Sequence, residues 1–313
     1  MSARTWLVFV LLAGPALAAA QSKNQQIQWE TNSQRGIATA QQSHRPLMIY
    51  VVGSTDEREN QLENAQRRSF ANADVLSVSR RFVCVRVSRS QGRNLLRDLD
   101  LSVLGNMEIV FISPDAKMID RVAPSEVAAP DAFCQKMAAA FDSYRTGLFN
   151  NELKPKLEDK EAKAADLKIA LGFIREFTIL KADETVVKVA KDQAVTKDVR
   201  AAAFDTLALL ATKPAVETLL EAARAGDADA GARLGDVLPG GAEYMLEALE
   251  DNDSKFAIKV YDSLLKICQI KNKKPASFWE KAPEKQRRDE LERVKQAARE
   301  TAKRWRDQYA EYR

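Results

Sequence analysis

The segment 46–54, which reads PLMIYVVGS, most limits what this chain can fold into. Pro46 biases the residue before it toward extended geometry, and Gly53 ends the apolar run too early for a helix. A continuous apolar run of this length is typical of a strand buried on both faces, as in a parallel sheet covered by helices. We predict that it forms the central strand of a first domain. The polar stretch after it opens into a helix, which is a common place for chemistry.

Residues 1–20 have the pattern of a cleaved signal peptide rather than of a folded segment. Arg4 supplies positive charge, residues 6–13 form a short apolar run, and Ala16-Leu17-Ala18 matches an A-x-A cleavage site. The apolar run is too short to span a bilayer, and no later segment is apolar enough to do so. We therefore expect an exported chain, periplasmic or extracellular, with no integral membrane segment after cleavage.

The residues after the leader are numerous enough for two domains. The whole chain has 48 basic and 44 acidic residues, and its basic excess lies in the last part, 271–313. A basic tail can indicate an anionic partner. Because acidic residues are interleaved with the basic ones there, and because the chain is expected to be exported, we predict a solvated helix and no nucleic-acid partner.

The chain offers few residues for thiol or metal chemistry. Its three cysteines, Cys84, Cys134 and Cys268, are too sparse for a disulfide scaffold and lie in apolar patterns. We predict buried, inert thiols, and the sequence leaves a Cys84–Cys134 bridge open. The single histidine, His44, stands at the end of a polar helix, where we expect a solvated or capping role. With no cysteine pair and no compact acidic cluster, we predict no metal site and no cofactor.

From Trp29 onward the chain alternates predicted helices and strands. The predicted strands are 46–52, 82–87, 108–112 and 118–122, and a turn with proline at its second position joins the last two. The predicted helices are 33–43, 57–69, 94–98 and 130–144, while 76–80 continues irregularly or as a helix. Parallel strands followed by a hairpin and a last helix indicate an α/β layered domain, which we assign to residues 21–148.

This order of elements, with the strings RPLMIYVVGS, NADV, RFVCVRV and MEIVFISPDAKMIDRV, resembles the thioredoxin-like fold. The resemblance covers residues 27–146 and is strongest to exported members of that family. It implies a C-x-x-C motif at the start of the helix after the first strand, where the helix N-terminus stabilises a thiolate. It also implies a cis-proline just before the third strand.

The chain departs from the family at both of these places. Glu57 and Asn60 occupy the two cysteine positions, and Met107 occupies the proline position. Thiol–disulfide exchange needs a thiolate nucleophile, and a cis bond before a residue other than proline is costly, so we expect Met107 to be trans. Acidic residues such as Glu57 and Glu59 are explained by their position at a helix N-terminus. We therefore predict a redox-inactive domain without catalytic or cofactor-binding residues.

The second part of the chain reads as entirely helical. We predict a charged linker over 147–163, followed by helices at 164–180, 183–193, 197–211, 214–225, 227–237, 242–250 and 254–270. Similar helix pairs begin near Asp198, Asp227 and Ser254, at spacings of 29 and 27 residues. This pattern resembles HEAT-type repeats, although the usual repeat is longer, at about 40 residues. We assign residues 149–273 to HEAT-like repeats, and the sequence leaves open whether they form a solenoid or a compact bundle.

Residues 274–313 are predicted to form a C-terminal capping helix that begins near Glu284. Its less polar residues recur at spacings of three and four and form a narrow seam, namely Leu291, Val294, Ala298, Thr301, Trp305, Gln308 and Tyr312. A partner helix or a coiled coil is the alternative for this seam. Phe278 and Trp279 lie in the connection before the helix, where we expect them to anchor it.

These features favour a non-catalytic, exported interaction or scaffold protein with a thioredoxin-like domain and HEAT-like repeats. Its partner is expected to be a protein that the sequence does not identify. The alternative is an enzyme related to thiol–disulfide oxidoreductases that uses an unconventional cysteine. We expect partner contact on the helical surface more than at the shallow groove beside residues 54–60 and 106–107, because a specific interface needs about 800 Å² from each partner.

Overall fold

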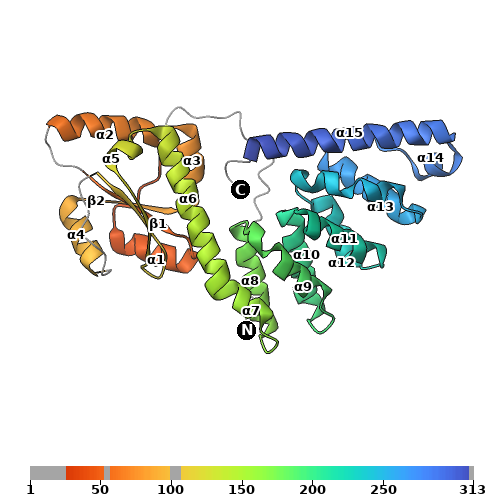
Figure 1. Cartoon of the computed structure of the whole chain (residues 1–313), viewed down its shortest axis with the longest axis horizontal. Helices are drawn as coiled ribbons and strands as arrows, with labels where there is room; N and C mark the ends of the chain where they lie inside the picture. The colour runs from red at the N-terminus through yellow and green to blue at the C-terminus, as the bar shows by residue number, and fades with distance from the viewer. Residues whose placement is uncertain (1–25, 53–56, 99–106, 310–313) are drawn as a thin grey trace, which may run out of the picture. The chain divides into compact units, whose positions relative to one another are not determined.

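The computed structural model describes residues 26–52, 57–98 and 107–309 (Figure 1). The predicted leader at 1–20 lies outside the described residues, as does Tyr312 at the end of the tail. Contacts within the chain divide it into two compact units, Met1–Ala140 and Phe141–Arg313. In its described residues the first unit contains a small mixed sheet with helices, and the second is helical.

The sheet of the N-terminal unit has four strands in the order β2-β1-β3-β4. Its strands are β1 (Leu47–Val51), β2 (Val83–Val87), β3 (Ile109–Ile112) and β4 (Met118–Val122). β1 pairs parallel with β2 and antiparallel with β3, and β3 pairs antiparallel with β4. The apolar run that begins after Pro46 is therefore an interior strand, as predicted, but it has a parallel neighbour on one side only.

Helices cover both faces of this sheet (Figure 1). They are α1 (Ser33–Ser43), α2 (Glu57–Phe70), α3 (Ala73–Ser79), α4 (Arg89–Asp98), α5 (Pro124–Val127) and α6 (Pro130–Leu148). On one face Ala40 of α1 and Leu95 of α4 join the core formed by Ile49 and its neighbours. On the other face the rings of Phe70 from α2 and Phe133 from α6 lie 6.0 Å apart. All five residues of β1 are consequently buried.

Local signals explain where the first helix begins and ends. The side chain of Asn32 accepts a hydrogen bond from the backbone N–H of Arg35 and caps the N-terminus of α1. His44 ends the helix in the left-handed region, with φ 51°, and its N–H donates to the carbonyl of Ala40. His44 thus has the predicted capping role. A Cβ at Gly36 would lie 2.5 Å from Val85, so the glycine permits close packing of α1 on β2.

Two helices of this unit are longer than the sequence indicated. α3 covers a stretch predicted as irregular or helical, and it is capped by Asn72, whose side chain accepts from the N–H groups of Asp74 and Val75. α4 begins at Arg89, well before the predicted start at residue 94. Its first turn is polar and therefore has no apolar periodicity to reveal it.

The C-terminal unit is a succession of short helices. Its α-helices are α7 (Lys154–Glu158), α8 (Ala164–Glu176), α9 (Asp183–Lys191), α10 (Lys197–Leu210), α11 (Lys213–Arg224), α12 (Ala228–Arg233), α13 (Ser254–Ile267), α14 (Ala276–Lys281) and α15 (Glu284–Tyr309). A π-helical turn, η2 (Phe149–Leu153), precedes α7, and 3-10 helices occur at η3 (Leu180–Ala182), η4 (Leu234–Asp236), η5 (Pro239–Met245) and η6 (Glu247–Glu250). The region predicted as one helix over 242–250 is therefore two 3-10 segments. A Cβ at Gly241 would lie 2.8 Å from Val237, so any larger residue at that position would require its neighbours to shift.

The linker predicted over 147–163 is wrong, because the chain is helical through Glu158. Phe149, Leu153 and Leu157 recur every four residues and are all buried. A single apolar residue per turn inside a highly charged stretch is enough to hold a helix against its neighbours, but it gives a weak pattern in the sequence. Pro155 lies in the first turn of α7, where a proline is tolerated.

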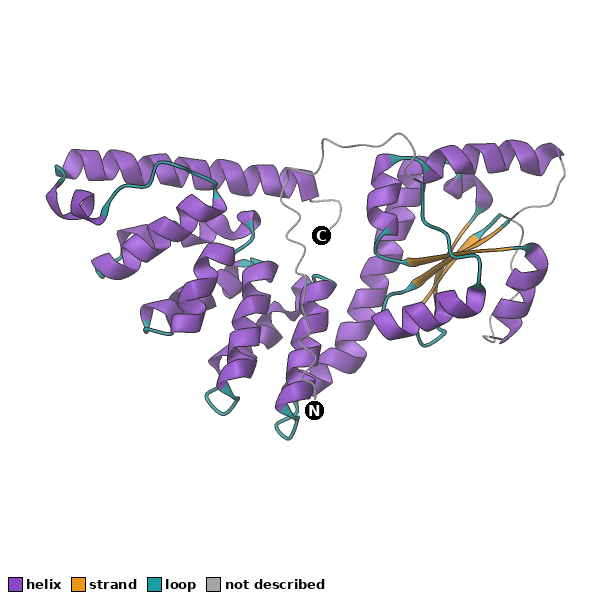
Figure 2. Cartoon of the chain, turned by 180° about the vertical axis from the view of Figure 1, so that it is seen from behind, coloured by secondary structure: helices purple, strands orange, loops and turns teal. Residues whose placement is uncertain are grey.

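Ion pairs link helices of this unit that are one repeat period apart in the sequence. Asp205 of α10 pairs with Arg175 of α8 at 3.7 Å and with Arg233 of α12. Asp236, the last residue of η4, pairs with Arg233 at 3.6 Å and with Lys266 of α13 at 2.7 Å. In the pairs that join different helices, the two residues are 28 to 30 positions apart in the sequence. The pairs Lys168–Asp198 and Lys191–Glu221 have the same spacing. The spacing agrees with the repeat period in the sequence, and Figure 2 shows the loops between helix pairs along one edge of the unit.

The long helix α15 packs against η5 and α13. Val294, Ala298 and Ala302 on its seam are fully buried. Leu291, Thr301 and Trp305 are partly buried, whereas Gln308 is exposed, so the predicted seam ends before that residue. Among the helices of the described ranges, none is long and apolar enough to cross a membrane.

Candidate functional site

The residues at the positions of the missing redox motif lie on two elements of the N-terminal unit. Glu57 and Asn60 are in the first turn of α2, and Asn60 is exposed, whereas the side chain of Glu57 lies outside the described residues. Met107, just before β3, is 1% exposed and adopts a left-handed φ of 64°. Its N–H donates to the carbonyl of Val51 at 2.9 Å, which fixes it against the end of β1.

The buried side chain of Gln66 on α2 joins these parts, although no sequence pattern distinguishes this residue from its polar neighbours. Its Nε2 donates to the carbonyl oxygens of Met107 and Pro124, each at 3.0 Å. Its Oε1 accepts a hydrogen bond from the hydroxyl of Tyr50 at 2.9 Å. Gln66 is fully buried and uses both ends of its amide, so it holds α2 against β1, the start of β3 and the start of α5.

The cysteines are free thiols, and two of them are in surroundings that disfavour a thiolate. Burial raises the pKa of Cys84 to about 12, and its Sγ lies 3.5 Å from the carbonyl oxygen of Ser79. Burial also raises the pKa of Cys268 on the edge of α13. Cys134 is half-buried on α6. Within the described part of the chain, no three His, Cys, Asp or Glu side chains are grouped so that they could hold a metal ion.

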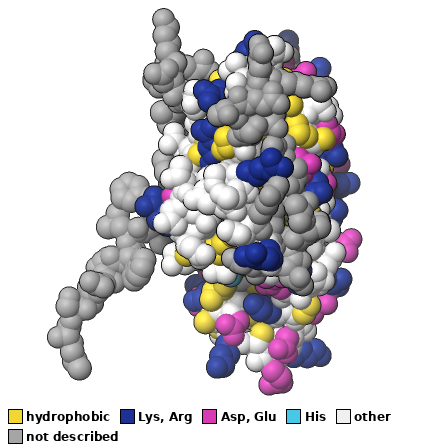
Figure 3. Space-filling model, turned by 90° about the vertical axis from the view of Figure 1, so that its left-hand side faces the viewer, with side chains coloured by type: hydrophobic (Ala, Val, Ile, Leu, Met, Phe, Trp, Pro, Cys, Tyr) yellow, Lys and Arg dark blue, Asp and Glu magenta, His cyan; other side chains and the backbone are white. Residues whose placement is uncertain are grey.

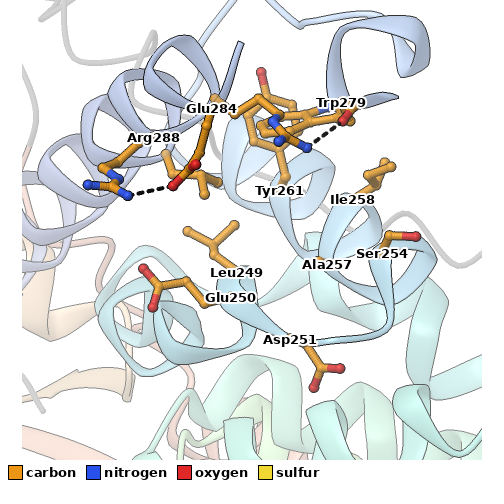
Figure 4. A pocket seen from close by; sticks show the side chains of 12 residues that line it. Leu249, Glu250, Asp251, Ser254, Ala257, Ile258, Tyr261, Trp279, Glu284 and Arg288 are labelled. Atoms are coloured by element: carbon orange, nitrogen blue, oxygen red, sulfur yellow. Dashed lines mark hydrogen bonds and ion pairs between the residues drawn. The ribbon is translucent and has the colours of Figure 1, made fainter. Parts of the chain in front are cut away.

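The clearest cavity lies in the C-terminal unit, between η6, α13, α14 and the start of α15, and has a volume of about 350 Å³ (Figure 4). We call it the α13–α15 pocket. Its apolar lining residues are Leu249, Ala257, Ile258, Tyr261, Trp279 and Leu291. Its polar lining residues are Glu250, Asp251, Ser254, Glu284, Arg287 and Arg288. Its volume is at the lower end of the range of about 300–1,000 Å³ that is usual for ligand pockets.

Local structure fixes the walls of this pocket. Asp253 caps α13 by accepting from the N–H groups of Lys255 and Phe256. The rings of Tyr261 and Trp279 have centroids 4.8 Å apart at an angle of 73°, and Figure 4 shows them together on one side of the cavity. Trp279 therefore anchors the connection before α15, as the sequence suggested.

A buried polar network holds the α15 wall in place. The hydroxyl of Tyr261 donates to Oε1 of Glu290 at 2.7 Å and accepts from the backbone N–H of Lys274 at 3.1 Å. Arg293 pairs with the same carboxylate at 2.5 Å, and the side chain of Glu290 is 6% exposed. Burial, followed by the nearby Glu290 carboxylate, raises the pKa of Tyr261 to about 12. This network joins α13, the connection after it and α15.

The acidic residues of the α13–α15 pocket all have basic partners. Glu250 pairs with Lys295, whose hydrogen bond lowers the carboxyl pKa. Glu284 pairs with Arg288 at 2.7 Å, as the dashed line in Figure 4 marks. Asp251 pairs at 3.0 Å with an arginine on α11. The negative charges of the lining are therefore compensated within the chain.

Arg287 differs from these residues because it has no carboxylate partner among the described residues. Its Nη1 donates to the backbone carbonyl of Trp279 at 3.1 Å. Its Nε and the indole Nε1 of Trp279 are both buried without an acceptor. An unpaired buried donor costs about 1–3 kcal/mol, and such groups call for an explanation in a native structure. The pocket therefore combines an apolar wall with one uncompensated positive charge.

On the face that Figure 3 shows, the described side chains form no large patch of one charge. There Lys and Arg side chains are spread out with Asp and Glu side chains between them. In the N-terminal unit a smaller cavity of about 140 Å³ is lined by Trp29, Tyr50, Glu63 and Arg86 among others. Arg67 also lines it, and Glu63 pairs with Arg67 at 2.9 Å and with Arg86 at 3.3 Å, so both of these cations already have a carboxylate partner.

Comparison of the chain with models of protein families, with curated proteins and with solved structures found no match.

Proposed function

We propose that this chain is an exported, non-catalytic interaction protein in which a thioredoxin-like domain is joined to HEAT-like helical repeats. The observation that carries the proposal is the α13–α15 pocket, whose apolar wall and uncompensated Arg287 suit the binding of a partner group. The partner is a protein, and the helical unit carries the principal contact.

The fold supports the family part of this proposal. A parallel β1–α2–β2 unit is followed by the β3–β4 hairpin and the last helix α6, which is the element order on which the thioredoxin-like resemblance rests. Ion pairs that repeat at intervals of 28 to 30 residues support tandem helical repeats in the second unit. These are short for HEAT repeats, which usually have about 40 residues.

The alternative, a thiol oxidoreductase that uses an unconventional cysteine, has less support. A reactive cysteine needs a low pKa and access to substrate. Cys84 has the opposite properties, because it is buried and its pKa is raised to about 12. A direct comparison in an insulin reduction assay tests this alternative. We expect the chain to reduce insulin no faster than a cysteine-free variant, and faster turnover would favour the enzyme.

Site-specific photo-crosslinking tests where the partner binds. A benzophenone amino acid is placed in the full chain at Ile258 in the pocket, at Asn60 on α2, or at Ile169 on α8, and the variants are expressed in the cells of origin. Ile169 is 55% exposed and lies outside the pocket, so it controls for nonspecific adducts at an apolar surface position. We expect a discrete protein adduct from Ile258 only. An adduct from Asn60 alone would place the contact on the thioredoxin-like domain and contradict the proposal.

Export is tested separately by the N-terminal sequence of the chain recovered outside the cytoplasm. Signal cleavage after the A-x-A site predicts a mature chain that begins near Gln21. A chain that keeps residues 1–20 and stays in the cytoplasm would contradict this part of the proposal.

A further inference from the structure

We infer that the α13–α15 pocket binds the carboxyl-terminal residue of a partner polypeptide, with its apolar side chain against Tyr261 and Trp279 and its carboxylate on Arg287. The inference rests on the proposed interaction function and adds the chemistry of the bound group. It requires three properties of the pocket, namely a site for one negative charge, an apolar wall beside it, and room for little more than one residue.

The charge balance of the pocket selects a single anionic group. Glu250, Asp251 and Glu284 each pair with a basic side chain of the protein, and the distances of the last two pairs are 3.0 Å and 2.7 Å. Arg287 is the lining cation that has no carboxylate partner among the described residues. A bound carboxylate would complete the set of pairs. A phosphate group carries a charge of about −1.5 to −2 and would bring excess negative charge close to three carboxylates.

The hydrogen-bonding groups agree with a carboxylate. The Nε of Arg287 and the indole N–H of Trp279 are buried donors without an acceptor and without exposed surface, so we assign the carboxylate to the outer guanidinium nitrogen Nη2 of Arg287. A carboxylate has two acceptor oxygens, and its charge-assisted hydrogen bonds with a guanidinium are among the stronger ones in proteins. The guanidinium is already oriented by its bond to the carbonyl of Trp279 at 3.1 Å, so little further ordering is needed on binding.

The wall and the volume indicate what accompanies the carboxylate. Leu249 and Tyr261 are 4% and 1% exposed, and the Trp279 ring packs on Tyr261, so this wall is rigid. A cavity of about 350 Å³ is small for a ligand pocket and suits one large side chain with its carboxylate. The last residue of a polypeptide presents both groups on one α-carbon, and capture of a terminal carboxylate is an established way to recognise peptides.

Peptide binding to the full-length chain tests the inference. The probe is a fluorescein-labelled pentapeptide, Gly-Ser-Gly-Ser-Phe, prepared as the free acid and as the amide, and its binding is followed by fluorescence anisotropy. We expect the acid to bind at least about tenfold more tightly than the amide, because only the acid offers the charged acceptor. A peptide that ends in lysine is expected to bind about tenfold more weakly than the one that ends in phenylalanine, because lysine cannot fill the apolar wall.

Three variants assign the effect to a residue. Arg287→Gln is expected to remove the preference for the acid, and Arg287→Lys to keep part of it. Arg299→Gln, at an exposed position of α15 that does not line the pocket, is expected to leave the preference unchanged. Circular dichroism melting curves of the variants check that each is folded.

Three results would overturn the inference: equal affinity for acid and amide, no binding of either at millimolar concentration, or a preference that survives Arg287→Gln. Tighter binding of octanoate than of the peptide acid would also overturn it and would assign the pocket to a lipid-derived acid. The proposed function is judged by the Ile258 crosslink instead. A crosslink that persists in the Arg287→Gln variant would reject the terminal carboxylate while keeping the interaction function.

Discussion

Replacement of Gln66 by methionine should destabilise the N-terminal unit more than a change to any exposed residue of α2. The side chain is fully buried and makes three hydrogen bonds, one with the Tyr50 hydroxyl at 2.9 Å and one each to the Met107 and Pro124 carbonyls at 3.0 Å. Methionine has a similar length and shape, so Gln66→Met removes the hydrogen bonds while it leaves the packing nearly intact.

The magnitude follows from what the substitution leaves unpaired. Each intramolecular hydrogen bond contributes about 1 kcal/mol, and a buried polar group left without a partner costs about 1–3 kcal/mol. The Pro124 carbonyl also accepts from the N–H of Ala128 at 3.2 Å, so the unpaired groups are the Tyr50 hydroxyl and the Met107 carbonyl. We expect the free energy of unfolding to fall by about 3 kcal/mol. Tyr50→Phe breaks only one of the bonds and should cost about half as much.

Urea denaturation followed by the fluorescence of Trp29 measures this effect in the right unit. The ring of Trp29 lies 5.6 Å from that of Tyr50 and 5.4 Å from that of Phe70, so its emission reports on this core. Trp6, Trp279 and Trp305 are replaced by phenylalanine in the reference protein, so that Trp29 is its single tryptophan. A probe in one unit is needed because a chain with two units does not have to unfold in one step.

Ser69 provides a matched control on the same helix. Its side chain is also fully buried, but its hydroxyl has no hydrogen-bond partner. Ser69→Ala removes an unpaired polar group and favours the helix, so stability should stay the same or rise by up to about 1 kcal/mol. The double variant of Tyr50→Phe and Gln66→Met should lose less than the sum of the single changes, because both remove one shared bond. A loss from Gln66→Met no larger than that from Ser69→Ala would refute the reasoning.

Three further predictions concern single groups. Tyr261→Phe removes the hydroxyl that donates to Glu290 and should lower the free energy of unfolding by about 2 kcal/mol in urea denaturation; an unchanged midpoint would contradict the network. The hydrogen bond from Lys168 lowers the pKa of Asp198 to about 2, so its stabilisation is present above the ordinary carboxyl pKa of 3.8 and is lost as the pH falls toward 2. Asp198→Asn should therefore flatten the fall of the urea midpoint between pH 4 and pH 2, and an unaltered slope would argue against it. Burial raises the pKa of Cys84 to about 12, so in a variant without the other cysteines it should react with Ellman's reagent at pH 8 only on unfolding, and rapid labelling of the native chain would contradict its burial.

The sheet could be read from the sequence because its signals are local and strong. The run from Leu47 to Val51 is apolar throughout and is closed by proline and glycine, and the strand lies where that pattern placed it. The turn at 113–116 and the helix cap at His44 are likewise determined by nearby residues. The direction of β3 depends on how distant segments pair, and no local pattern determines that.

The linker between the two parts was misjudged because charge is a poor guide to helix formation. Lys154, Lys156 and Glu158 are on the exposed side, while Leu153 and Leu157 are buried on the opposite one. A highly charged segment is helical when its one row of buried apolar side chains packs against neighbouring helices. Because α6 also continues past the boundary between the units at residue 140, cleavage within this region is expected to be less selective than its composition suggests.

The α13–α15 pocket was beyond the reach of sequence reasoning for a geometric reason. Its walls come from η6, α13, α14 and α15. Its distinguishing residue is Arg287, which has no carboxylate partner among the described residues. The sequence predicts a solvated helix with interleaved acidic and basic residues, and the pair of Arg288 with Glu284 fits that pattern. Arg287, one position earlier, donates instead to the backbone carbonyl of Trp279, and its positive charge has no carboxylate partner among the described residues. The pocket therefore depends on the capping helix and not on the repeats alone, so a search for the partner should use the chain with α15 intact.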